Sequence, residues 1–141
     1  TLFAEEDQKE TSPMALVPVF IGFDYDHDLD CKNLLVGQAK NPDTPFEISD
    51  HSVKVASPGW KDDARRRIKR VQQVIVICGE HTHTATGVNE EIRIARSEGK
   101  PYFLLDGRPN GTARKPTAAL DSDKIYNWTW DNLKKLIAGG R

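Results

Sequence analysis

The stretch Val74-Ile75-Val76-Ile77-Cys78 is the clearest strand in the chain. Its residues are apolar and mostly β-branched, and a run of this kind is typical of a strand that is buried on both faces, as in a parallel sheet. Patterns typical of helices lie on both sides of it, at residues 60–71 and 88–98. A buried strand between two helices indicates βαβ units, and therefore an α/β fold.

Short apolar runs alternate with helical patterns along the rest of the chain as well. Further strands are expected at residues 17–23, 46–48, 102–105 and 125–128. We therefore predict a three-layer sandwich of the flavodoxin-like kind, in which helices cover both faces of a mainly parallel five-stranded sheet.

Two further helices begin at residues that are common helix caps. Asp28 is expected to cap a helix that ends near Ala39, and Thr129 is expected to cap the last helix of the chain. The first of these helices has three leucines as its expected buried side chains, Leu29, Leu34 and Leu35. The last helix has Leu133, Leu136 and Ile137.

The composition limits the partners that the chain can have. Twenty basic and 21 acidic side chains leave a net charge of −1, so no overall field draws the protein to nucleic acid or to an anionic membrane. The apolar runs are far shorter than the roughly 20 residues of a membrane helix. Cys31 and Cys78 both lie inside expected elements, which indicates reduced thiols and a cytoplasmic location.

The length of 141 residues fits one domain, which we place at residues 14–141. Residues 1–13 are acidic and polar, and they have neither the basic start nor the apolar core of a signal peptide. We interpret them as a disordered tail or an added leader.

The most site-like stretch is Phe23-Asp24-Tyr25-Asp26-His27-Asp28, which follows the first expected strand. In an open parallel sheet, ligands bind beyond the carboxyl ends of the strands. Aromatic rings and acids in one loop suit a nucleotide, because a ring stacks on a base and carboxylates hold ribose hydroxyls. The same acids also suit a turn and a helix cap, or a divalent metal. The residues alone leave these alternatives open.

A second candidate is the long segment at residues 49–59, which contains Asp50 and His51 and is expected to be a binding loop. We expect Asp50 and His51 to face one cleft with Phe23 and Tyr25, next to the start of the helix at Val88.

The sequence lacks the residues that several common activities require. The strand at residues 74–78 leads into Gly79 and Glu80, so the phospho-accepting aspartate of a response-regulator receiver is missing. The dinucleotide glycine fingerprint, the phosphate loop of nucleotide triphosphatases and the nucleophile elbow of hydrolases are also missing. Cys78, His81 and His83 are too few donors for a zinc site, so we expect no metal.

Four motifs together carry a resemblance to a known family. They are Val19-Phe20-Ile21-Gly22-Phe23-Asp24-Tyr25, the strand at residues 74–78 with Gly79, Gly87-Val88-Asn89-Glu90-Glu91-Ile92, and Gly99-Lys100-Pro101. In their order and spacing they resemble the Toll/interleukin-1 receptor (TIR)-like proteins of bacteria, and in particular the ThsB group of Thoeris antiphage systems. The resemblance extends from about Val17 to the end of the chain and implies a TIR-like form of the predicted sandwich.

The resemblance implies a signalling enzyme that cleaves the nicotinamide glycosidic bond of NAD and makes a linear or cyclic ADP-ribose signal. NAD would then be a substrate, with no further cofactor, and the diffusible product would act on a separate effector protein. The family's catalytic glutamate matches Glu91, and Phe23, Asp24, Tyr25, Asp50 and His51 are the expected substrate-binding residues. TIR-like surfaces also self-associate, so the alternative is a noncatalytic interaction module.

Helical geometry gives a separate reason to prefer Glu91 to its neighbour Glu90. Val88, Ile92 and Ala95 form one inward stripe, and Glu91 falls on its border. Glu90 points away from the stripe and has Arg93 three residues later, an ordinary surface pair. A carboxylate beside an apolar stripe is directed to a cleft or complements the helix dipole, and we favour the cleft.

Overall fold

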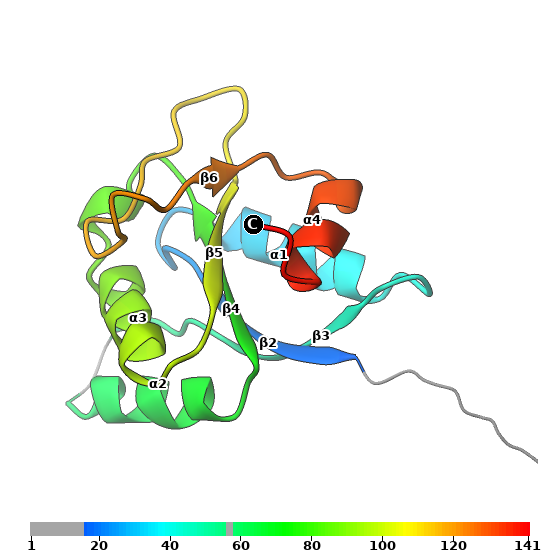
Figure 1. The fold of residues 1–141 in the computed structure, drawn as a ribbon. Coiled ribbons are helices and arrows are strands. Elements are labelled where there is room, and N and C mark those ends of the chain that lie inside the picture. Colours follow the sequence, from blue (N-terminus) through cyan, green and yellow to red (C-terminus); the bar gives the residue numbers. More distant parts are fainter. Residues whose placement is uncertain (1–15, 56–57) are drawn as a thin grey trace, which may run out of the picture.

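The protein forms one five-stranded sheet in a computed structural model that describes residues 16–55 and 58–141 (Figure 1). The tail predicted at residues 1–13 lies outside the described residues. The strands lie in the order β3-β2-β4-β5-β6, and all four neighbouring pairs are parallel. The strands are β2 (Val17–Gly22), β3 (Phe46–His51), β4 (Gln73–Cys78), β5 (Tyr102–Asp106) and β6 (Ile125–Tyr126).

Helices cover both faces of this sheet, which confirms the predicted α/β sandwich. The helices are α1 (Leu29–Ala39), α2 (Trp60–Lys69), α3 (Thr86–Ser97), α4 (Trp130–Ile137) and the short 3-10 helix η1 (Thr82–Thr84). Figure 1 shows α1 and α4 on one side of the sheet and α2 and α3 on the other. None of the helices in the described part of the chain has the length and apolar character needed to span a membrane.

The strand β4 shows why this sequence needs two helical layers. Side chains alternate between the faces of a strand. Ile75 and Ile77 pack with the core residues of α1 and α4, whereas Val74, Val76 and Cys78 pack with those of α2 and α3. All five side chains are buried, so the predicted central strand is confirmed.

Several local expectations are wrong for the helix α1. Leu29 and Leu34 are exposed, Leu34 to 57%, and the buried residues are Cys31 and Leu35, one helical turn apart. Asp28 stands at the N-cap position, but its side chain makes no capping hydrogen bond. An ion pair, described below, holds its buried carboxylate instead.

The other boundaries differ from the prediction by a few residues. The strand β3 continues to His51, so the binding loop expected from residue 49 starts later, and β6 ends at Tyr126. The helix α3 begins at Thr86 rather than Val88. Thr129 caps α4 as predicted, because its Oγ1 accepts a hydrogen bond of 3.1 Å from the backbone N–H of Asn132.

The strand order creates a crevice between β2 and β4. The helix that follows β2 packs on one face of the sheet, and the helix that follows β4 packs on the other. The loops after these two neighbouring strands therefore diverge at their carboxyl ends. Ligands bind at such a switch point in open α/β sheets, so the fold places the crevice where residues 23–28 leave the sheet.

An ion pair between the partly exposed Arg108 and the buried Asp28 holds the loop after β2 in place. The Nη2 atom of Arg108, just after β5, donates to Asp28 Oδ1 and to the carbonyl oxygen of His27, each at 3.0 Å. Asp28 is 1% exposed, and its carboxylate packs so closely on Gly79 that a Cβ there would lie 2.2 Å from Oδ2. Burial raises the pKa of Asp28, and the guanidinium of Arg108 partly offsets this.

We expect Arg108→Gln to destabilise the protein by about 2–4 kcal/mol, because it leaves the carboxylate of Asp28 buried without its cation. Urea denaturation measures this loss. Arg114→Gln is the matched control, since Arg114 is exposed and has no ion pair among the described residues. Adding Asp28→Asn to the Arg108→Gln variant should recover part of the loss. Equal stability of the two single variants would contradict this role.

Candidate functional site

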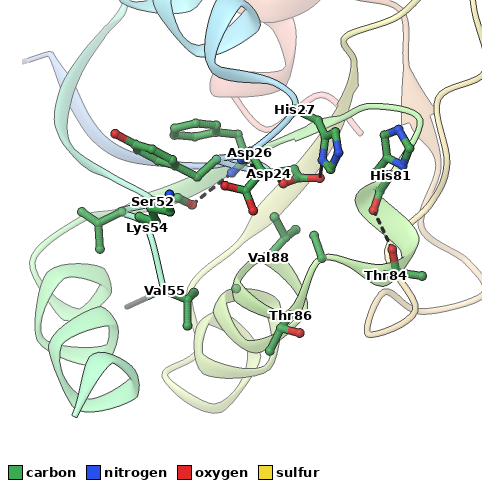
Figure 2. Close-up of a pocket in the computed structure, with 15 residues that line it drawn as sticks. Asp24, Asp26, His27, Ser52, Lys54, Val55, His81, Thr84, Thr86 and Val88 are labelled. Atoms are coloured by element: carbon green, nitrogen blue, oxygen red, sulfur yellow. Dashed lines mark hydrogen bonds and ion pairs between the residues drawn. The ribbon is translucent and has the colours of Figure 1, made fainter. Parts of the chain in front are cut away.

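A cavity of about 410 Å³ opens at the crevice between the loops after β2 and β4. Three segments line it, namely residues 23–27 after β2, residues 52–55 after β3, and residues 81 and 84–88, which lead into α3 (Figure 2). The cavity thus lies where the parallel-sheet rule predicts a ligand site. Its volume falls within the range of small-molecule sites in proteins.

Three of the predicted site residues lie in the lining, Phe23, Asp24 and Tyr25. The ring of Phe23 belongs mainly to the core, and the ring of Tyr25 stacks on it at a centroid distance of 5.8 Å. Tyr25 is 38% exposed, so one side of the stack is fixed by the core and the other is free to meet a ligand ring.

Asp50 and His51 do not line this cavity, contrary to the prediction. Because β3 continues through His51, both residues pair with β2 in the sheet. The carboxylate of Asp50 accepts a hydrogen bond of 2.7 Å from Arg67 on α2, and Nδ1 of His51 is 2.8 Å from the carbonyl oxygen of Ser52. Ser52, the first residue after the strand, reaches the cavity in their place.

The carboxyl group of Glu91 lies behind this wall of the cavity. Glu91 projects from α3, is only 4% exposed, and lines a small void beside the cavity rather than the cavity itself. The hydroxyl of Ser52 donates a hydrogen bond of 2.6 Å to Glu91 Oε1 and accepts one of 3.0 Å from the backbone N–H of Phe23. A Cβ on Gly22 would lie 3.2 Å from the same carboxylate oxygen.

The neighbouring Glu90 has the surface role that was predicted for it. Its carboxylate pairs with Arg93 at 3.3 Å and with Lys61 at 3.9 Å. Glu91 has no cation of this kind among its described contacts, and burial raises its pKa to about 8 although the hydrogen bond from Ser52 acts in the opposite direction. A carboxyl group with such a pKa beside a cavity is typical of a functional site.

Sequence reasoning named neither Ser52 nor His81 as a binding residue, and it included His27 in the site-like stretch without giving it a role of its own. Nδ1 of His27 lies 2.7 Å from Asp24 Oδ2, and the ring of His27 stacks on that of His81 at 4.0 Å. The spacing of Asp24 and His27 was visible in the sequence. In the sequence, His81 is only a candidate zinc donor. Among the described residues, no group of three His, Cys, Asp or Glu side chains could hold a metal ion.

We expect Glu91→Gln to stabilise the protein above neutral pH. The folded protein holds the proton of Glu91 up to about pH 8, whereas the unfolded chain releases it near 4.5. Between these values the folded state binds more protons, so the stability of the wild type falls as pH rises through this window, and the penalty is complete above it. Glutamine carries no such penalty.

Thermal denaturation at pH 4 and pH 8.5 tests this expectation. The melting temperature of Glu91→Gln should exceed that of the wild type by roughly 5 °C or more at pH 8.5 and should match it at pH 4. Glu90→Gln is the control and should show no such pH-dependent difference. A gain of the same size at both pH values would show that Glu91 does not titrate as described.

Comparison with known proteins gives a match to one family model. A search of curated proteins finds no match. The model of the family described as Thoeris protein ThsB, TIR-like domain, matches residues 20–106, which is more than half of the chain. The matched region includes all three segments of the cavity together with Glu91. The chain therefore belongs to the TIR-like domain family of the Thoeris protein ThsB.

Proposed function

We propose that this domain is a signalling enzyme that cleaves the nicotinamide glycosidic bond of NAD. The observation that carries the proposal is the buried carboxyl group of Glu91, which has no cation among its described contacts and lies behind the wall of the cavity at the switch point of the sheet. Membership of a TIR-like family supports the same chemistry.

Several features of the cavity support a nicotinamide riboside as its ligand. The exposed ring of Tyr25 offers a platform for a flat heteroaromatic ring, with Phe23 fixed behind it. Val88 lines the cavity one helical turn before Glu91, and Ser52 lines it while holding the carboxyl group of Glu91. A ribose at the wall formed by Ser52 and Val88 would therefore be closest to Glu91, after the carboxylate exchanges its bond to Ser52.

The reaction breaks the bond between C1′ of the ribose and the ring nitrogen of nicotinamide, which leaves with the electron pair of that bond. Positive charge develops on the ribose, as in glycoside hydrolysis. An ionised Glu91 would stabilise this charge, because its carboxylate is buried and electrostatic interactions are strong away from water. The cationic nicotinamide ring of bound NAD would favour the ionised form of Glu91, whose pKa is raised in the free protein.

The ADP-ribose unit is then transferred to water or cyclised, and the product carries the signal to a separate effector in antiphage defence. A buried acid of this kind lowers the stability of the fold. Such a cost is expected where the acid takes part in catalysis, and it is not expected in a module that acts only through protein contacts. Glu91 is an acid of this kind, and this favours the enzyme over the noncatalytic alternative.

The direct test is to incubate the pure protein with NAD and to resolve the products by mass spectrometry. Glu91→Gln should lower nicotinamide release by at least about 100-fold, because it removes the charge that stabilises the transition state. Glu90→Gln should keep most of the activity, since Glu90 pairs with surface cations. Equal rates for the two variants, in a protein shown to cleave NAD, would remove Glu91 from the mechanism.

The activity should also rise with pH. If the free enzyme must present an ionised Glu91, kcat/KM should increase roughly tenfold per pH unit below about 8, the pKa of this group, and level off above it. Initial rates of nicotinamide release between pH 5.5 and 9.5 measure the profile. A profile that is flat or falls between pH 6 and 8 would contradict this assignment.

A further inference from the structure

Asp24 and His27 form a hydrogen-bonded pair in the lining of the cavity (Figure 2). The Oδ1 atom of Asp24 accepts a hydrogen bond of 3.1 Å from the backbone N–H of Asp26, and Oδ2 lies 2.7 Å from Nδ1 of His27. Asp24 is buried, so its carboxylate has little freedom to leave the ring. A carboxylate that accepts from Nδ1–H fixes the imidazole tautomer and leaves a lone pair on Nε2.

One further contact holds the imidazole of His27, and another holds its backbone. The ring of His27 stacks on the ring of His81 with an interplanar angle of 23°, and the carbonyl oxygen of His27 accepts a hydrogen bond from Arg108. The backbone of His81 is held in turn, because its carbonyl oxygen accepts hydrogen bonds from the backbone N–H and the hydroxyl of Thr84. The ring of His27 is thus positioned by residues from the loops after β2, β4 and β5.

The free edge of this ring is available for chemistry. The side chain of His27 is 48% exposed and lines the cavity, and its Nε2 atom has no hydrogen-bond partner among the described residues. An oriented imidazole with one nitrogen on a carboxylate and the other toward a cavity is the usual arrangement of a general base.

We propose that His27 is the catalytic base for the second half of the reaction and that Asp24 is its positioning residue. This inference rests on the proposed cleavage of NAD. After nicotinamide has left, the oxygen of an attacking O–H group, from water or from the ADP-ribose unit itself, forms a bond to C1′. The proton of that O–H group passes to Nε2 of His27, so that charge and atoms balance.

Glu91 is poorly suited to this second role. It must remain ionised while positive charge is present on the ribose, and its carboxylate lies behind the lining of the cavity, bonded to Ser52. Glu91 behind Ser52 and His27 in the lining can instead divide the two tasks, one acting on the developing charge and the other on the incoming nucleophile.

The test compares two kinds of nucleophile that attack C1′: O–H groups, which must lose a proton, and a pyridine nitrogen, which has no proton to lose. A pyridine nitrogen attacks C1′ with a free electron pair and releases no proton, so exchange of nicotinamide for 3-acetylpyridine needs no base. The wild type, His27→Gln, Asp24→Asn and His83→Gln are each incubated with NAD, with and without 3-acetylpyridine. Mass spectrometry then follows the exchanged dinucleotide and the products of O–H attack separately.

His27→Gln should lose the products of O–H attack by about 100-fold or more while keeping pyridine exchange within about threefold of the wild type. Asp24→Asn should change the ratio of the two reactions in the same direction, because it no longer fixes the tautomer. His83→Gln is the matched control, since His83 lies in η1 but does not line the cavity. It should leave both reactions unchanged.

Two results would overturn the proposal. In the first, a folded His27→Gln variant loses O–H attack and pyridine exchange to the same extent, which indicates a role in binding. In the second, the rate of neither reaction falls. If His27→Gln lowers the melting temperature, His27→Asn provides the same comparison. A wild type that neither releases nicotinamide nor exchanges it would refute NAD cleavage itself, and with it the role of His27. An active wild type with an unaffected His27→Gln refutes only the present inference.

Discussion

The hydrogen bond from Ser52 to Glu91 joins the three parts of the molecule that form the site. Ser52 follows β3, Glu91 lies on α3, and the backbone N–H that donates to Ser52 belongs to Phe23, just after β2. The carboxyl group is buried, and without a hydrogen-bond partner such a group is costly. The position of the cavity wall therefore depends on this one hydroxyl, which fixes both the end of β3 and the helix that carries the acid.

The sequence was sufficient for the fold because the hydrophobic pattern of each element is local. The run at residues 74–78 is apolar at every position, and only a strand with a helical layer on each face buries all of it. The failures occurred where a distant contact overrides a local preference. Aspartate is a residue type that commonly caps helices. The carboxylate of Asp28 instead accepts a hydrogen bond from Arg108, which lies 80 residues later in the sequence, and therefore does not cap the helix.

The site was predicted in part for the same reason. The position of Glu91 follows from helical periodicity, and the rings of Phe23 and Tyr25 follow directly from a recognisable strand. Asp50 and His51 were misplaced because the end of β3 depends on its pairing with β2, whose register shifts between Val19 and Phe20. No pattern within residues 49–59 reveals that shift, and it decides which side chain leaves the sheet at the cavity.

The acids of the site are held in three different ways, and each way suits a different task. Asp28 is buried beside a guanidinium and serves the structure. Asp24 is buried against an imidazole that reaches the cavity, so its charge acts on a group that can exchange a proton with a ligand. Glu91 has only a neutral hydroxyl as its described partner, so an ionised Glu91 has no described cation to balance its charge. A cationic ligand would supply the missing charge, and this is why the proposed substrate is one whose positive charge lies at the bond to be broken.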